Sequence, residues 1–247
     1  MLGILRGTAC IIFDLDGVIL DYKRRYFGTC QMVFDKKEIR LDRDLIIECR
    51  RAGGSTVEAV LKSIRNKHPE FDLSVVPELL KEREKTIESW AVLRKFNYPL
   101  PGAKHSLKSL YAVLPIYLVT SRKNETNLRR ELEMNNLKNY FTTVLCLAKL
   151  ETKGQAIEQI LREEECEPAR CIFISDVAQE LKEAKALGVT IVGVLSGLEG
   201  EEALSRANPD LIIGNIAEFA LLLRKAFLPR NIISTRLEGR LRGEKFA

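Results

Sequence analysis

The chain has 247 residues, of which 46% are hydrophobic and 30% charged, with 15 Gly and 8 Pro. This composition excludes a collagenous, low-complexity or intrinsically disordered protein. A chain of this length can form one α/β domain with a smaller one attached, and its core needs neither disulfides nor a structural metal. The formal net charge is +5, a weak excess for a protein of this size.

No apolar run approaches the roughly 20 residues that a membrane-spanning helix needs. The longest uncharged stretch near such a run is 186–198, and the N-terminal segment lacks the small-residue cleavage site of a secretory signal. We therefore expect a cytoplasmic protein without a membrane span.

Cysteine and histidine usage limits the kinds of site that the chain can build. The two histidines, His68 and His105, exclude a histidine-based metal centre or a Ser-His-Asp triad, so any metal should have oxygen ligands. No two cysteines form a C-x-x-C pair, which favours reduced core thiols over a bridge or a zinc site. The six cysteines are Cys10, Cys30, Cys49, Cys146, Cys166 and Cys171.

The first predicted element is an apolar strand over residues 9–13. The sequence then becomes charged and helix-rich as far as Tyr98, with no convincing strand. Turn signals flank this stretch, Asp16-Gly17 before it and the PLPG of residues 99–102 after it. We interpret residues 18–98 as an inserted helical subdomain, with helices predicted over 43–52, 56–67 and 75–96.

From residue 100 onward, short β-branched runs alternate with helical patterns, which is typical of βα units around a parallel sheet. The strands read as continuous apolar runs, as expected when helices cover both faces. The predicted strands are 115–120, 142–147, 170–175, 189–195 and 210–214, and the helices between and after them are 124–136, 152–165, 178–188, 199–207 and 216–227. The predicted fold is α/β, a Rossmann-like core of residues 1–17 and 99–227 with the helical insertion.

Residues 228–247 form a predicted basic tail. Residues 224–247 hold seven basic and two acidic residues, so this segment carries the whole net charge. It contains two aromatic residues and no nucleic-acid motif, and we therefore do not expect nucleic acid as a partner. The tail could be solvated, docked on the core or bound to an acidic partner. The sequence leaves the oligomeric state open between monomer and homodimer.

The strongest chemical signal is the sequence IIFDLDGVILDY at the first strand. Asp14 and Asp16 follow the buried strand at i and i+2, and Gly17 permits a sharp turn. Ligands of open α/β sheets bind at the carboxyl ends of the strands, so both carboxylates stand where a site would form. In isolation, the same pattern also fits an ordinary strand end with an Asp-Gly turn.

Later strand ends supply more polar groups. Thr120-Ser121 ends the second strand, where hydroxyls and backbone N–H groups can hold a phosphoryl oxygen, although such a pair is often only an N-cap. Lys153 opens the helix after the third strand, and by itself it could be a surface lysine. Ser175-Asp176 ends the fourth strand, with Glu180 four residues on. Together these groups predict an oxygen-lined site suited to Mg²⁺.

These motifs, in this order, resemble those of the haloacid dehalogenase superfamily. They are Asp14-x-Asp16-Gly17, Thr120, Lys153 and Ser175-Asp176 with Glu180, and the resemblance spans residues 9–223. The insertion resembles the helical cap of the phosphoglycolate phosphatase and β-phosphoglucomutase branch. Two positions depart from the family pattern: Ser175 stands where Gly is frequent, and Glu180 where Asp is usual.

The resemblance implies a role for each motif residue. Asp14 would be the nucleophile that forms an aspartyl-phosphate, and Asp16 the acid and base for the leaving alcohol and the attacking water. Mg²⁺ would be held by Asp14, the backbone carbonyl of Asp16, and Asp176. Thr120 and Lys153 would position and neutralise the transferring group. Since dehalogenases that attack carbon need no acid at the position of Asp16, its presence favours phosphate esters.

Substrate contacts beyond the phosphate are expected from Ser121 and from two cap residues, Arg24 and Arg51. Lys23 and Arg25 are further candidates beside Arg24, and each of these cations could equally lie on a solvated helical face. If two of them point inward, they would suit a carboxylate or a second phosphate.

The sequence therefore predicts a Mg²⁺-dependent phosphatase of a small phosphorylated metabolite, phosphoglycolate or a sugar-phosphate-like compound. One alternative is a phosphosugar mutase, for which no dedicated acid/base residue can be identified in the cap. The other is a non-catalytic binding or regulatory protein that acts through its basic tail.

Overall fold

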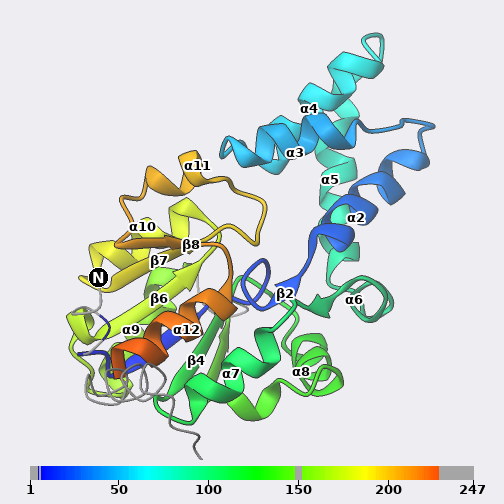
Figure 1. Cartoon of the computed structure of the whole chain (residues 1–247). Helices are drawn as coiled ribbons and strands as arrows, with labels where there is room; N and C mark the ends of the chain where they lie inside the picture. The colour runs from blue at the N-terminus through cyan, green and yellow to red at the C-terminus, as the bar shows by residue number, and fades with distance from the viewer. Residues whose placement is uncertain (1–4, 6, 148–151, 228–247) are drawn as a thin grey trace, which may run out of the picture.

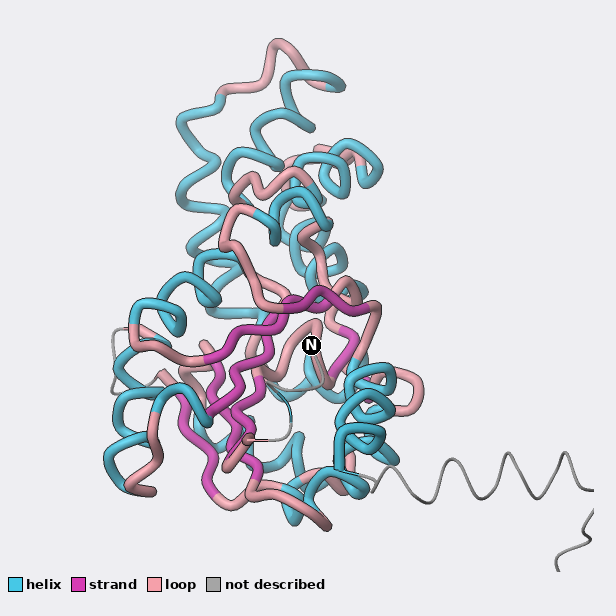
Figure 2. The backbone as a smooth tube through the Cα atoms, turned by 60° about the vertical axis from the view of Figure 1, so that its left-hand side comes forward, coloured by secondary structure: helices cyan, strands magenta, loops and turns pink. Residues whose placement is uncertain are grey.

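The computed structural model describes residues 5, 7–147 and 152–227. An α/β core carries a separate group of helices inserted after its first strand, here called the cap (Figure 1). The tube view shows the cap helices stacked above the strands of the core (Figure 2). The predicted basic tail of residues 228–247 lies outside the described residues.

The core is built on one parallel sheet with the strand order β5-β4-β1-β6-β7-β8. Its strands are β1 (Cys10–Phe13), β4 (Ile116–Thr120), β5 (Thr143–Cys146), β6 (Cys171–Ser175), β7 (Thr190–Val194) and β8 (Leu211–Ile213). In register, Phe13 of β1 stands beside Leu118 of β4 and Ile174 of β6. The predicted α/β class is confirmed, and β1 occupies the centre of the sheet with β4 and β6 on either side.

Alternate residues of the strands face two helical layers. Ile11 and Phe13 belong to the apolar cluster that includes α7 (Ala103–Tyr111), α8 (Glu125–Met134) and α12 (Ile216–Phe227). Cys10 and Ile12 belong to the opposite cluster, with α9 (Lys153–Glu163) and α10 (Ala178–Ala186). Figure 1 shows α7 and α12 side by side on the near face of the sheet. Burial on both faces explains why the strands are apolar throughout.

The cap has its own core. Its helices are α2 (Lys23–Asp35), α3 (Arg43–Arg51), α4 (Thr56–Lys67), α5 (Val76–Ile87) and α6 (Trp90–Phe96). Tyr26, Phe34, Ile46 and Ile64 are among the buried residues that hold these helices together. The helix predicted over 75–96 is two helices, because Ser89 has extended backbone (φ −66°, ψ 142°) and separates α5 from α6.

A two-stranded ribbon joins the cap to the core. β2 (Leu20–Asp21) pairs antiparallel with β3 (Tyr98–Pro99), and the N–H of Leu100 donates to the carbonyl of Ile19 at 2.8 Å. The chain therefore enters and leaves the cap side by side. Both crossings lie next to the predicted turns, Asp16-Gly17 on entry and the PLPG of residues 99–102 on return.

The six cysteines are free thiols, four of them buried, and the Sγ atoms of Cys10 and Cys166 lie 3.5 Å apart. In the part of the chain that the structure describes, no helix is both long and apolar enough to cross a membrane.

Replacing Phe219 tests the packing of α12 on the sheet. Phe219 is fully buried and meets the ring of Phe13 edge to face, with centroids 6.5 Å apart. Phe219→Ala should lower the free energy of unfolding by about 3–5 kcal/mol in urea titration, because a large cavity replaces the ring. Leu221→Ala is the control on the same helix: its side chain is 59% exposed, so the change should stay within about 0.5 kcal/mol.

Candidate active site

The carboxyl ends of three neighbouring strands open into one cavity of about 220 Å³. β1 leads to Asp14 and Asp16, β4 ends at Thr120, and β6 ends one residue before Asp176. The first residue of α9, Lys153, completes the core side of the cavity. The lining residues are Asp14, Asp16, Tyr22, Arg25, Ile87, Glu88, Thr120, Ser121, Arg122, Lys153, Asp176, Val177 and Glu180.

Lys153 is the buried cation that contacts Asp14. Its Nζ lies 2.5 Å from Oδ1 of Asp14 and 2.7 Å from Oε2 of Glu180. The hydroxyl of Ser175 donates to the same Glu180 oxygen at 2.6 Å, and that of Ser121 donates to Oε1 at 3.3 Å. A capping box at Thr152 fixes the start of α9 and with it the position of the lysine. Glu180 therefore orients Lys153 toward Asp14.

The surroundings of Asp14 and Asp176 disfavour the charged form of both carboxyl groups. Burial raises the pKa of Asp14 to about 7, even though the Lys153 ammonium opposes the shift. Burial, with the charges of Asp14 and Glu180, raises the pKa of Asp176 well above its usual range. Burial alone would lower the pKa of Lys153, but the two adjacent carboxylates outweigh it and raise that pKa. The site thus holds more negative charge than its lysine can balance.

Asp176 is packed in a cradle of backbone. Its Oδ2 accepts the N–H of Leu198 at 3.3 Å, and its Oδ1 is buried without a hydrogen-bond partner. A Cβ atom at Gly17 or Gly197 would collide with this carboxylate, and Gly17 has a positive φ of 87°. Glycine at position 17 therefore serves both the turn and the close approach of Asp176.

Asp16 lies between two arginines. Arg122 donates from Nε to Oδ2 at 2.7 Å and from Nη2 to Oδ1 at 2.9 Å, and Arg25 donates from Nη2 to Oδ2 at 2.5 Å. Burial by itself would raise the pKa of Asp16, but the two guanidiniums outweigh it and hold that pKa well below its usual range. In this conformation Asp16 is a carboxylate anion.

Arg122 is held from behind by a buried acid. Its Nη2 lies 3.1 Å from Oε2 of Glu131, whose other oxygen accepts from Nδ2 of Asn97 at 2.7 Å. Asn97 directly precedes β3, where the chain returns from the cap. The orientation of Arg122 thus depends on both the core helix α8 and the base of the cap.

The cap closes the cavity with Tyr22, Arg25, Ile87 and Glu88. The Glu88 carboxylate accepts the N–H groups of Lys123, at 3.0 Å, and Asn124, at 2.8 Å, which stand at the start of α8. An acidic group is favourable there because backbone donors at a helix start lack other partners. Glu88 therefore fastens the cap to the core.

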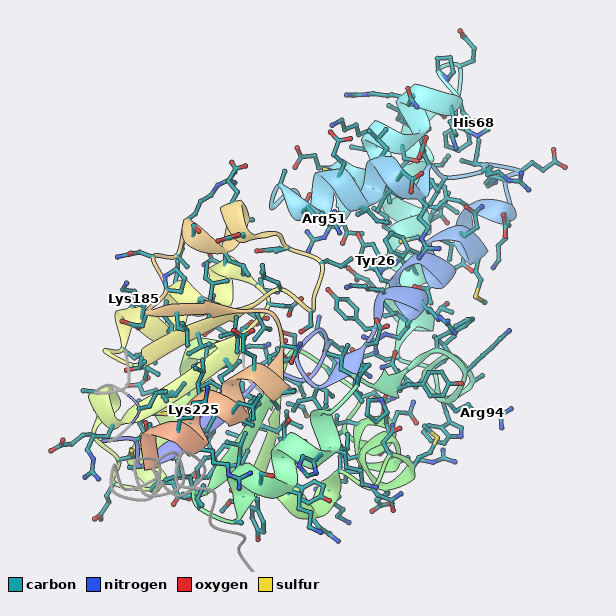
Figure 3. The ribbon with its side chains drawn as sticks, viewed as in Figure 1. Tyr26, Arg51, His68, Arg94, Lys185 and Lys225 are labelled. Carbon is teal, nitrogen blue, oxygen red and sulfur yellow. The ribbon has the colours of Figure 1, made fainter. Side chains whose placement is uncertain are left out.

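The predicted motif residues Asp14, Asp16, Thr120, Ser121, Lys153, Asp176 and Glu180 all line this cavity, while Gly17 and Ser175 contact its carboxylates. Arg24 and Arg51, the predicted cap contacts, do not: both are exposed and neither lines the cavity. Figure 3 shows Arg51 at the end of α3, near the core loop where its carbonyl accepts the N–H of Gly200 at 3.0 Å. These two residues are a correction to the prediction.

In both cases an arginine adjacent in sequence is more buried than the predicted one. Arg25 is 3% exposed and lines the cavity, while Arg50 is partly buried against Gly54 and Glu199. One residue along a helix turns the side chain by about 100°, so an error of one position is enough to reverse its direction.

Two charged lining residues, Arg122 and Glu88, were not among the residues considered for the predicted site. Arg122 could have been noticed, since it follows Thr120-Ser121 at a strand end where site residues collect. Glu88 gives no such signal, because its position depends on the break between α5 and α6.

Comparison with known proteins agrees with this geometry. Residues 11–194 match the family described as haloacid dehalogenase-like hydrolase. A phosphoglycolate phosphatase from Shigella boydii is 24% identical over 230 residues, which are 86% of this chain and 90% of that protein.

Solved structures share the fold. A haloacid dehalogenase-like family protein from Streptococcus pneumoniae has a TM-score of 0.71 at 16% identity, and the match covers 87% of this chain and 98% of that one. A hydrolase of the same family from Deinococcus radiodurans, with bound phosphate and sodium, has a TM-score of 0.70 at 20% identity, covering 90% and 97%. Because the family match extends from β1 to the end of β7, the resemblance seen in the motifs is confirmed, and the chain belongs to the haloacid dehalogenase-like hydrolase family.

Proposed function

We propose that this hydrolase is a Mg²⁺-dependent phosphatase of a small phosphorylated metabolite. The observation that carries the proposal is the pairing of Asp14 with Lys153 in a cavity that also holds Asp16 and Asp176. A nucleophilic carboxylate, a second carboxylate two residues on and a fixed cation are the groups that phosphoryl transfer through an aspartyl-phosphate requires.

The residues around Asp176 fit a hard cation. Its Oδ1 is buried without a hydrogen-bond partner, and the pKa values of Asp176 and Asp14 are raised chiefly by burial. Among the described residues, no three His, Cys, Asp or Glu side chains form a metal cluster. Asp14 and Asp176 would therefore hold Mg²⁺ together with the main-chain carbonyl of Asp16, a set that Mg²⁺ accepts because it keeps water and substrate oxygens as ligands. When bound, Mg²⁺ would neutralise carboxylate charge and polarise a phosphoryl oxygen.

Asp14 would attack the phosphorus of the substrate while Lys153 holds one oxygen of the Asp14 carboxylate. A P–O bond to the Asp14 carboxylate forms as the bond to the leaving alcohol breaks. Lys153 and Thr120 offset the negative charge that spreads over the phosphoryl oxygens. Water then attacks the same phosphorus and releases phosphate with the Asp14 carboxylate restored.

Asp16 would handle the protons of both steps. In its neutral carboxyl form it gives a proton to the departing alkoxide, and the resulting carboxylate takes one from the attacking water, which restores the carboxyl form. In the conformation described here both of its oxygens are held by arginines. As an anion Asp16 has no proton to give, so before the first step it must take up a proton from solvent and exchange at least one of these arginine contacts for the substrate.

The size of the cavity favours a short substrate. Its volume of about 220 Å³ is below the range typical of pockets for drug-sized ligands. Phosphoglycolate or a sugar-phosphate-like compound is the proposed class, and phosphoglycolate is supported by the description of the Shigella boydii relative.

Replacing Asp14 tests the mechanism. Asp14→Asn should reduce Mg²⁺-dependent phosphate release from a panel of phosphorylated metabolites by at least about 10³-fold, because the amide is not a nucleophile. EDTA should abolish release by the wild-type protein. Asp44→Asn, at an exposed position in cap helix α3, is the control and should retain wild-type activity.

Phosphate release that persists in Asp14→Asn would refute the proposal, as would silence of the wild-type protein across the panel with Mg²⁺. An isomerised sugar phosphate formed without free phosphate would identify a mutase instead.

Removing the Asp176 charge tests the metal site. A carboxyl whose pKa is raised on folding adds stability at low pH and loses it as pH rises, so the metal-free protein should become less stable between about pH 4 and pH 7. Asp176→Asn should flatten this dependence and raise the free energy of unfolding in EDTA at pH 7.5 by about 1–3 kcal/mol.

Mg²⁺ should stabilise the wild-type protein against urea and leave Asp176→Asn almost unchanged, since the variant lacks a ligand. Equal stabilisation of both proteins by Mg²⁺ would place the cation elsewhere.

A further inference from the structure

Arg25 is a buried cation that the cap brings into the active site. It lies on the first turn of α2, four residues after the β2 strand, and is 3% exposed. The structure gives its guanidinium one ionic partner, Asp16, and its Nε and Nη1 are buried without hydrogen-bond partners. Unsatisfied donors on a buried charge are costly, so this side chain is poised for a further acceptor.

The cations of the cavity divide into two groups. Lys153 contacts Asp14, the proposed site of phosphoryl transfer, whereas Arg25 and Arg122 contact Asp16. Because Asp16 would protonate the leaving oxygen, the carbon part of the substrate must lie on its side of the cavity. Arg25 therefore stands next to the leaving group and not next to the phosphate.

The two arginines differ in how freely they can take a new partner. Arg122 grips Asp16 with two nitrogens and is also paired with Glu131. Arg25 contributes a single nitrogen to Asp16 and has no ion pair to another acid among the described residues. Loss of the Arg25 contact would leave Asp16 still oriented by Arg122.

We propose that Arg25 exchanges carboxylates: without substrate it holds Asp16, and with substrate it binds an anionic group carried by the leaving alcohol. This inference rests on the proposed function and narrows it to phosphate esters of small hydroxy acids. Binding of the substrate carboxylate to Arg25 removes one of the two donors from Oδ2 of Asp16, while Arg122 still contacts both oxygens and keeps the carboxyl group oriented. Arg25 is thus a specificity-determining residue that couples recognition of the acid to the number of cations in contact with Asp16.

The experiment compares two esters of similar size, phosphoglycolate and ethylene glycol monophosphate, which carries a neutral hydroxymethyl group in place of the carboxylate. The wild-type protein should favour phosphoglycolate in kcat/KM by at least about 10-fold. Arg25→Gln should lower kcat/KM for phosphoglycolate by about 30- to 100-fold and change that for the neutral ester by less than about 3-fold. Arg25→Lys should recover part of the loss, because it restores the charge.

Arg94→Gln is the matched control. Arg94 is exposed on α6 and, in Figure 3, stands away from the other labelled cap residues, so the variant should behave as wild type on both esters. Equal losses for the two esters in Arg25→Gln would overturn the inference, since Arg25 would then act through Asp16 alone. A wild-type protein that does not distinguish the esters would overturn it as well.

Binding without turnover separates this inference from the proposed function. In the Asp14→Asn background, calorimetry should show tighter binding of phosphoglycolate than of the neutral ester, and adding Arg25→Gln should remove the difference. If this discrimination is found but the wild-type protein releases no phosphate, the proposed function fails while Arg25 remains the carboxylate receptor. If phosphate is released and the discrimination is absent, the inference fails and the proposed function stands.

Discussion

The structure depends on the pairing of charged side chains that are buried at the carboxyl ends of the central strands. Asp14, Asp176 and Lys153 are each at most 4% exposed, in a position where an unpaired charge would be strongly destabilising. The paired cations come from different elements: Lys153, at the start of α9, pairs with Asp14, and Arg122, in the loop after β4, pairs with Asp16. The central place of β1 between β4 and β6 makes this pairing possible, since a strand at the sheet edge would have one such neighbour. The order of the strands therefore determines which charged groups can meet at the site.

Much of the core could be predicted because its signals are local. Strands such as 116–120 and 171–175 are continuous apolar runs with polar residues directly after them, so both the strand and the residue at its end can be identified from the sequence. The carboxylates after β1 needed no knowledge of packing, since every parallel strand ends at the same edge. Ser175 and Glu180, which depart from the usual family pattern, still meet in a hydrogen bond of 2.6 Å.

The cap was harder to predict because helical direction is set by packing. Arg24 and Arg25 are adjacent and chemically identical, and the sequence of α2 has no clean apolar stripe from which to choose between them. Tertiary contacts decide: Tyr26 and Phe34 face the cap core, which leaves Arg25 turned toward Asp16. The break at Ser89 coincides with another tertiary contact, since Glu88 accepts backbone N–H groups at the start of α8. Neither contact can be identified from the local sequence.

The β2–β3 ribbon joins the cap to the core, and the residues of the cap lie at different distances from it. In a rigid rotation about this ribbon, a residue moves in proportion to its distance from the axis. Arg25 lies one helical turn beyond β2, about 6 Å along the helix, whereas His68 lies at the far tip of the cap (Figure 3). Arg25 therefore lies close to the rotation axis, whereas the tip of the cap lies far from it. A rotation of the cap that opens the cavity would therefore displace Arg25 only slightly. The positive charge of Arg25 would stay beside Asp16 while a ligand enters.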